Sequence, residues 1–530
     1  MSGGSRTLGW MLSAVLTVGV ATMAAAQEQP VRGGTLRITV PEPVMLTGAF
    51  NSAGQIYVVS PKIHDGLVSY DADFKLQPQL ATAWAVSSDG KEIRFTLRPN
   101  VRWHDGKPFT SDDIAFSAMK VWKVAHPRGR SIYAHLEAVD TPDPLTAVFR
   151  FSQPAPYILS ALFSAESQPV PKHIYDGTDL ATNPNNVAPV GTGPFKFTRW
   201  ERGQYVQLDR NPDYWDQGKP YLDRVVFRFI PDPGARTVAF ETGEIDAGAG
   251  IPVPLNDARR LAGMPNMQVH LEGDEAINAQ TFLEFNLRRP LFQDVRVRRA
   301  IAHAVDRSFI ARNVYFNFAT PATGPVSKDL KRFYTADVPA YAYDPALAQK
   351  LLDEAGLKRG ADGIRARITH DPLPGNEFYV RTAEYFRQAM QRIGIAVEIR
   401  SADFATWYRR IYTDNDFDTS NYAAFNLADP TMGVQRFYWS KNIVKGVAFS
   451  NGSGYADADV DRAFEAAAIE VDPVKRAAQF HQMQKLVMRD VPNVPLVDLE
   501  WLSVTNRKVH NMVVPPLGPH GNFADTWIKP

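Results

Sequence analysis

The stretch VRWHDGKPFT, residues Val101–Thr110, joins two kinds of secondary structure and decides the fold. Its HDG segment, residues 104–106, fits the end of a strand followed by a tight turn. Upstream, Glu92–Leu97 alternates polar and apolar residues, which predicts a strand with one buried face. Thr110 can cap a helix, because acidic residues follow it and apolar residues then recur on one side as far as Trp122. This part of the chain therefore mixes strands and helices.

The chain beyond Thr281 is richer in helices. Asp-Pro pairs at residues 344–345 and 472–473 each place a capping residue before a proline at the first helical position. Asn376–Ile393 predicts a longer helix that stops at the following glycine and leads into a strand. We therefore expect an α/β domain with a largely parallel or mixed sheet between Thr281 and Pro495.

Composition limits the class of protein. The 530 residues include 58 Lys and Arg against 57 Asp and Glu, so the net charge of +1 argues against a nucleic-acid-binding protein. At roughly 100–200 residues per domain, this length predicts two to four domains. The chain has 0 Cys, which excludes disulfides, thiolate metal sites and lipid attachment through an N-terminal cysteine.

The N-terminal segment has the pattern of a cleaved signal peptide, residues 1–26. Arg6 precedes the largely apolar run Leu8–Ala21, and small residues at 24–26 suit a cleavage site. The apolar run is short for a membrane span, although an uncleaved anchor is the alternative. We expect an exported protein of the bacterial periplasm that is not a lipoprotein.

Motifs of hydrolytic and phosphate-binding enzymes are absent from the sequence: it has no HExxH, GxSxG or Walker pattern. His64 and His104 each precede an Asp, but neighbouring residues on a strand point to opposite faces and make a poor catalytic dyad. We expect a protein without catalytic residues. An exported hydrolase that uses Asp416 and Asp418 is the alternative from another class.

Metal and phosphate sites are also not expected. Asp457, Asp459 and Asp461 resemble the start of a calcium loop, but the Gly and Glu that such a loop needs are missing. The GTGP segment at residues 191–194 leads into a strand rather than a helix, so it predicts a tight turn and not a phosphate cradle. No cofactor is predicted.

Aromatic residues gather in one region of the second half of the chain. They are Trp407, Tyr408, Tyr412, Tyr422, Phe425, Phe437, Tyr438 and Trp439. Asn421, Asn426, Asp429 and Arg436 are interleaved with them, a mixture that suits a pocket wall which stacks on a ligand and orients it. Most large aromatic residues lie in a core, and that alternative stays open.

Several segments together resemble a known family. They are IHDGLVSYD at 63–71, PQLATAW at 78–84, FTLR at 95–98, VRWHDGKPFT at 101–110, GTGPF at 191–195, NPDYW at 211–215 and DVRVRRAI at 294–301. Their order and spacing resemble the periplasmic solute-binding proteins of the peptide/nickel/opine class of ABC importers. The resemblance extends from about Gly33 to Pro530.

The resemblance implies an α/β fold like that of periplasmic binding proteins, with two lobes, a hinge and an additional α+β subdomain. The expected divisions are residues 27–70, 191–280 and 501–530 for a discontinuous lobe I, 71–190 for the subdomain and 281–500 for lobe II. It also implies a monomer that closes around a solute and delivers it to a membrane permease served by a separate ATPase. No nucleic acid is an expected partner.

The resemblance gives a hypothesis about the solute. Peptide-binding relatives hold the ligand's ammonium with an Asp just upstream of an Asp-Pro pair, and here Asn426 takes that position before Asp429-Pro430. A neutral amide cannot form the charge-assisted hydrogen bond that a carboxylate gives an ammonium. We therefore expect an opine, a sugar conjugate or another small polar metabolite. A di- or oligopeptide is the alternative, because a shift of one or two residues would place Asp429 or Arg381 as the partner.

The candidate ligand-binding residues come from both lobes. They are Asn51 and Gln55 from the first lobe and Glu284, Trp407, Tyr422, Asn426, Asp429 and Arg436 from the second.

Overall fold

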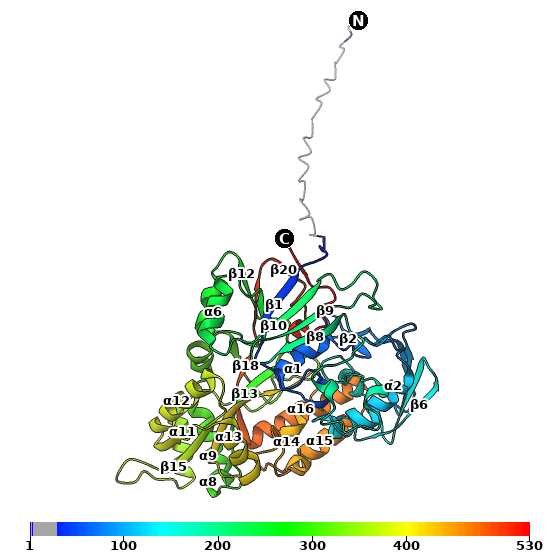
Figure 1. The fold of residues 1–530 in the computed structure, drawn as a ribbon. Helices are drawn as coiled ribbons and strands as arrows, with labels where there is room; N and C mark the ends of the chain where they lie inside the picture. The colour runs from blue at the N-terminus through cyan, green and yellow to red at the C-terminus, as the bar shows by residue number, and fades with distance from the viewer. Residues whose placement is uncertain (2, 4–28) are drawn as a thin grey trace.

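The computed structural model describes residues 1, 3 and 29–530, the side chain of residue 130 excepted. The predicted signal peptide, residues 1–26, lies outside the described residues apart from Met1 and Gly3. Three larger sheets, two small two-stranded sheets and the helices that cover them make up the described part of the molecule (Figure 1).

A seven-stranded sheet collects strands from distant parts of the chain. Its order is β12 (Met267–His270), β19 (Ser503–Asn506), β11 (Ala247–Gly248), β1 (Thr35–Thr39), β10 (Arg224–Arg228), β9 (Tyr205–Arg210) and β8 (Phe195–Glu201). β1 pairs in parallel with β10, and Leu36, Ile38 and Phe227 of these strands are fully buried. Segments from the beginning, middle and end of the chain thus share one core.

A separate six-stranded sheet lies in the second half of the chain. Its order is β14 (Ala319–Pro321), β18 (Asn493–Leu499), β13 (Ala279–Phe285), β17 (Thr419–Phe425), β15 (Ala366–Pro372) and β16 (Ile395–Ile399). β15 is parallel to both of its neighbours and the other pairs are antiparallel. The predicted α/β class is confirmed, and the sheet is mixed.

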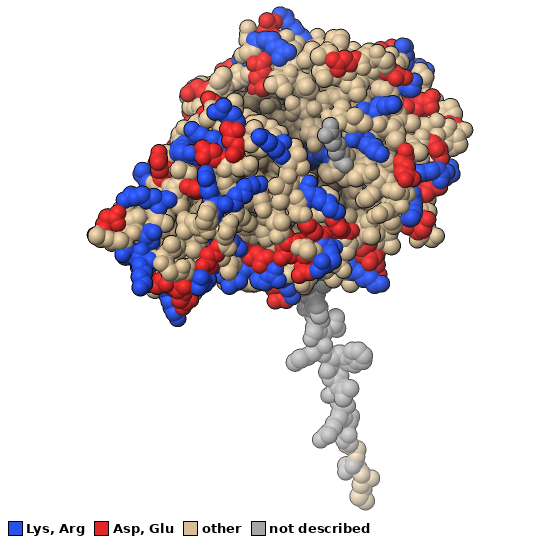
Figure 2. Space-filling model, turned by 90° about the horizontal axis from the view of Figure 1, so that it is seen from below, with Lys and Arg blue, Asp and Glu red and all other residues tan. Residues whose placement is uncertain are grey.

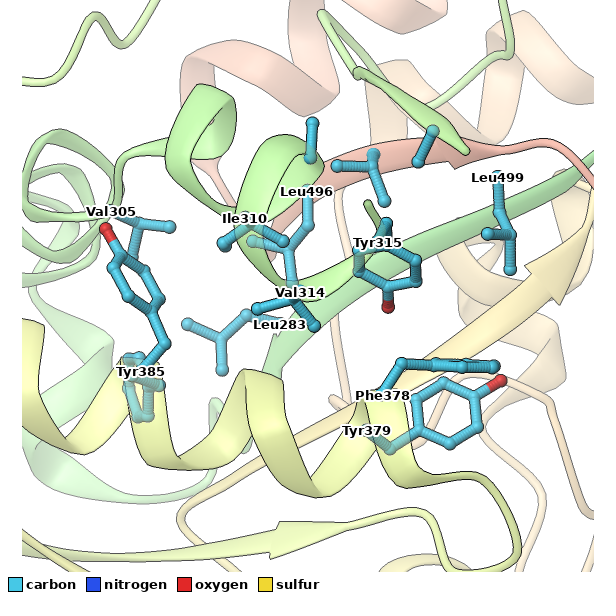
Figure 3. Packing of buried hydrophobic residues seen from close by; sticks show 14 of the residues in the cluster. Leu283, Val305, Ile310, Val314, Tyr315, Phe378, Tyr379, Tyr385, Leu496 and Leu499 are labelled. Carbon is cyan, nitrogen blue, oxygen red and sulfur yellow. The ribbon is translucent and has the colours of Figure 1, made fainter. Parts of the chain in front are cut away.

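Helices cover this sheet: α9 (Val295–Ala304), α11 (Pro345–Glu354) and α12 (Glu377–Arg392) lie together on one side of the molecule (Figure 1). Phe378, Tyr379 and Tyr385 of α12 share one buried cluster with Leu283 of β13 and Leu496 of β18 (Figure 3). Burial of such large apolar side chains is the main favourable contribution to folding.

The predicted helix caps are present in the structure. The carboxylate of Asp344 accepts from the backbone N–H of Leu347 (2.9 Å) at the start of α11. Asp472 accepts from Val474 (2.8 Å) and Lys475 (3.0 Å) at the start of α16 (Pro473–Asp490). Both caps satisfy N–H groups that have no partner within the helix.

The additional subdomain has a four-stranded antiparallel sheet. Its order is β4 (Ala81–Val86), β5 (Glu92–Leu97), β7 (Thr146–Phe151) and β6 (Leu136–Asp143). The predicted turn after β5 is confirmed, since Gly106 has a φ of 88° and donates to the carbonyl of Trp103 (2.8 Å). The predicted helix follows as α2 (Ser111–Phe116), continued by a π-helical segment, Ser117–Trp122.

Two short segments connect the two large sheets. One leads from β12, which ends at His270, to β13, which begins at Ala279, and the other from β18 to β19 through residues 500–502. This arrangement suits a hinge. The expected lobe boundaries themselves stay a prediction.

Helices α14 (Gln435–Tyr438), α15 (Ala458–Ile469) and α16 lie beside the subdomain (Figure 1). Positive and negative side chains are intermixed on the face in Figure 2, as the near-zero net charge leads one to expect. Within the described residues, none of the helices combines the length and apolar character required to span a bilayer.

The GTGP segment bends into β8, as a segment that leads into a strand should, and its glycines pack against the backbone of residues 62–63. A Cβ atom at Gly191 would lie 1.8 Å from the carbonyl oxygen of Ile63. We expect Gly191→Ala to lower the free energy of unfolding by about 3 kcal/mol, because that contact forces the backbone apart. Urea unfolding measures this. Gly54→Ala is the control, since nothing lies within 4 Å of its Cβ position, and an equal loss in both variants would contradict the prediction.

Candidate ligand-binding site

Most of the predicted aromatic residues form a core inside the second lobe. Trp407 and Tyr422 have 1% and 0% of their surface exposed, and their ring centres lie 5.6 Å apart. Tyr422 also packs on Phe282, with ring centres 4.6 Å apart. Trp407 and Tyr422 therefore shape the interior of the lobe.

Glu284 lies in the same core. Its carboxyl group accepts a hydrogen bond from the hydroxyl of Tyr422 (2.8 Å), and its exposed fraction is 2%. Burial raises the pKa of Glu284 to about 8, against an ordinary value of 4.5. The group is therefore mostly protonated and uncharged at neutral pH.

Asn426 and Asp429 have partners within the protein. The side-chain oxygen of Asn426 accepts from the backbone N–H of Ser327 (2.7 Å). Asp429 forms a buried bidentate pair with Arg476, at 2.6 and 2.8 Å. Both polar groups are thus engaged in holding the loop after β17.

Asn51 and Gln55 are half-buried near the start of α1 (Gly54–Val59). The Asn51 side chain accepts from the backbone N–H of Ala53 (2.9 Å), which fixes the turn into the helix. Neither residue lines the cavity that is described in the next paragraph.

A cavity of about 850 Å³ lies between the subdomain and the second lobe. The subdomain contributes residues 124–157 of its wall and the second lobe residues 431–469. Of the eight predicted residues, Arg436 lines this cavity and the other seven do not. Its volume is within the usual range for small-molecule sites.

Two arginines on opposite walls differ in their partners. Arg128 of the subdomain donates to both carboxylate oxygens of Glu166, at 2.8 and 2.5 Å, and its charge is neutralised. Arg436 of α14 has no ion pair among the described residues and donates to the carbonyl of Ala448 (3.0 Å). Burial, and then the nearby charge of Arg128, lower the pKa of Arg436 to about 10, so it remains a cation at neutral pH.

Two further cavity-lining side chains have polar atoms without a partner. They are Nε2 of His126 and Oε1 of Gln435, in residues that are 3% and 9% exposed. Burial lowers the pKa of His126, and its Nδ1 accepts from the backbone N–H of Arg128 (3.3 Å), so the neutral ring carries its proton on Nε2. Buried polar groups normally have partners, so these two atoms mark a place where a ligand can bind.

No motif in the sequence identifies the residues of the subdomain wall. His126 and Arg128 follow the helical segment that ends at Trp122, in a stretch that carries no recognised motif. One signal was the glycine at 129, where a Cβ atom would lie 1.5 Å from the carbonyl oxygen of Trp122. The chain folds back tightly there and brings both side chains into the wall.

In the part of the chain that the structure describes, no group of three or more His, Asp or Glu side chains is arranged to hold a metal ion. The cavity instead offers a cation, an N–H donor and an amide. This set is suited to hydrogen bonding a polar or anionic organic ligand.

The family model of the bacterial extracellular solute-binding proteins, family 5, matches residues 75–446. The chain belongs to this family. A putative ABC transporter peptide-binding protein of Brucella ovis is 29% identical over 481 residues, which cover 87% of each chain. The glutathione-binding protein GsiB of Salmonella paratyphi A is 25% identical over 496 residues, covering 89% of this chain and 90% of GsiB.

Solved structures agree with this assignment. NikZ of Campylobacter jejuni, in complex with Ni(L-His), superposes with a TM-score of 0.80 at 25% identity over 92% of this chain and 97% of its own. AgaA of A. tumefaciens R10, in complex with agropinic acid, gives a TM-score of 0.79 at 26% identity over 94% of this chain and 99% of its own. The predicted family and fold are confirmed, and the protein is a solute-binding component of an ABC importer.

The buried acid predicts a specific pH dependence. Because the folded-state pKa of Glu284 is about 8 and its ordinary value is 4.5, its contribution to stability is full below pH 4.5 and is lost as the pH rises to 8. In the wild-type protein this lowers the free energy of unfolding by on the order of 4 kcal/mol as the pH rises. We expect Glu284→Gln, which keeps an acceptor for Tyr422 but cannot ionise, to abolish that part of the pH dependence. Urea unfolding at pH 5 to 9 measures it. The exposed Glu137→Gln is the control, and identical pH profiles of both variants would refute the prediction.

Proposed function

We propose that this protein captures a small polar solute with a carboxylate group in the cavity between the subdomain and the second lobe. The observation that carries the proposal is Arg436, a cavity-lining cation without an ion-pair partner among the described residues. A ligand carboxylate beside Arg436 would give it an ion pair of the same kind as the pair that Arg128 forms with Glu166.

Capture works by closure of the two halves around the solute. The cavity has walls from the subdomain and from the second lobe, and two short segments connect the large sheets. A solute that contacts both walls stabilises the closed arrangement and shifts the population toward it. The closed protein then delivers the solute to the membrane permease, and a separate ATPase drives import.

A generic peptide is disfavoured as the solute. The two groups that sequence alignment offers for a peptide ammonium are Asn426, which is neutral, and Asp429, which is already paired with Arg476. Agropinic acid, which AgaA binds, is closer to the carboxylate chemistry of this cavity. Peptide and glutathione binding by relatives keep a peptide as the second candidate.

The remaining features of the proposal concern location and activity. Family members are extracellular, so a cleaved signal peptide at residues 1–26 and a periplasmic, monomeric protein without a lipid anchor fit this role.

The hydrolase alternative loses support, because Asp416 pairs with Arg289 and Arg400, and Asp418 pairs with Arg289. Neither Asp lines the cavity. We propose that the protein is not an enzyme.

The test of capture combines two measurements on the mature protein. Native mass spectrometry of protein purified from cells identifies any retained solute, and small-angle scattering compares the radius of gyration with and without it. We expect a carboxylate-bearing solute and a more compact complex. Micromolar binding of di- to pentapeptides by calorimetry, with no binding of the retained solute, would reverse the order of the two candidates.

Arg436→Gln tests the cation directly. We expect the affinity for the retained solute to fall by roughly 10- to 100-fold, because a charge-assisted hydrogen bond is lost. Calorimetry at neutral pH measures the change. Arg462→Gln is the matched control, since Arg462 is exposed and lies outside the cavity. An unchanged affinity in Arg436→Gln would exclude Arg436 as the anion-binding group.

A further inference from the structure

The exposed part of the cavity lining, here called the mouth, carries aliphatic side chains beside polar ones such as Gln153 and Lys441. Four of its lining side chains are aliphatic and exposed: Val124 by 57%, Val444 by 50%, Val447 by 42% and Ile469 by 39%. They come from both walls, Val124 from the subdomain and the other three from the second lobe. Single exposed apolar residues are ordinary on a protein surface, but four around one cavity form a patch that favours an apolar contact.

Further apolar residues line the cavity, and two of them, Pro127 and Ala134, are exposed as well. The same cavity is lined by Ala125, Pro127, Ala134, Met432, Ala466 and Ala468. Lys441 and Glu465, which also line the cavity, form an ion pair at 2.7 Å and together contribute no net charge. The cavity is also lined by polar residues that include Ser131, Gln153 and Asn442, so its wall combines apolar area for aliphatic or aromatic carbon with polar groups.

The polar groups favour a single negative charge. Arg436 is the cavity-lining cation that has no ion pair among the described residues, whereas Arg128 and Lys441 have theirs. Nε2–H of His126 can donate a hydrogen bond without adding charge, and Oε1 of Gln435 can accept one from a donor elsewhere on the same ligand. One carboxylate, with two oxygens, matches one guanidinium and one N–H donor.

From these observations we infer that the solute is an amphiphilic anion: a carboxylate held by Arg436 and His126, joined to an apolar body that lies against Val124, Val444, Val447 and Ile469. This inference rests on the proposed function and specifies its ligand class. It commits the cavity to a carboxylic acid conjugate with an aliphatic or aromatic part, rather than to a sugar or a uniformly polar compound.

A homologous series of N-acylglycines tests the apolar part. Acetyl-, hexanoyl- and decanoylglycine are titrated by calorimetry into mature protein freed of retained solute by unfolding and refolding. We expect the dissociation constant to fall with chain length, by up to about fourfold for each methylene that becomes fully buried. A dissociation constant that is independent of chain length would overturn the inference, while compaction on binding the retained solute would leave the proposed function standing.

The carboxylate is tested with the matching N-acylglycinamides. We expect the wild-type protein to prefer each acid over its amide by at least tenfold, and Arg436→Gln to lose that preference while it still binds the amides. Retained amide binding shows that the variant is folded. Arg462→Gln should keep the wild-type preference, and equal affinity of the wild-type protein for acid and amide would overturn the inference.

The mouth is tested by the double variant Val444→Ser, Val447→Ser. We expect it to lose most of the dependence on chain length, whereas Val474→Ser, an exposed valine outside the cavity, should keep it. If the double variant binds every acylglycine as the wild-type protein does but no longer supports uptake in cells, the apolar mouth contacts the permease and the inference is wrong.

Discussion

The buried carboxylate of Asp65 joins three distant parts of the chain, and the position of the subdomain on the first lobe depends on it. It accepts hydrogen bonds from Gln79 of the subdomain (2.8 Å), from Trp215 (2.7 Å) and from Asn522 near the C-terminus (3.1 Å). Burial raises its pKa to about 6, and the donors oppose that rise. A buried charge with this many donors is stable only when all of its partners are in place, so it couples the subdomain to the loops of the first lobe that carry Trp215 and Asn522.

Several of the motifs that reveal the family, among them the HDG and GTGP segments, meet at the same place and build the fold. The backbone N–H of Gly193 donates to the carbonyl of Ile63 (2.9 Å), and its own carbonyl accepts from Asn211 (3.0 Å) and contacts Nε2 of His104 (3.0 Å). These close backbone contacts fix the subdomain on the first lobe. One wall of the cavity is therefore held in position, and the second lobe provides the other.

The sequence predicts the elements better than it predicts the site. Local patterns identify the caps at Asp344 and Asp472 because a cap and its helix are adjacent in the chain. The pairing of Asp429 with Arg476 joins residues 47 positions apart, and no local pattern reveals it. For the same reason the sequence could not separate Tyr422, which is buried in a core, from Arg436, which lines the cavity. The distinction depends on which groups already have partners.

The two arginines also give a physical reason for closure on a ligand. Burial is the main cause of the lowered pKa of Arg436, the charge of Arg128 across the cavity adds to it, and Glu166 opposes it, so bringing the two walls together leaves Arg436 as a buried cation without an ion pair among the described residues. Glu166 compensates the charge of Arg128 from within the subdomain, whereas no described carboxylate pairs with Arg436. Under the proposed function, a bound carboxylate would compensate the charge of Arg436 and add hydrogen bonds to both walls at once. Such a ligand would bind the closed protein more tightly than the open one. This difference in affinity is what a solute needs in order to shift the protein from an open to a closed population.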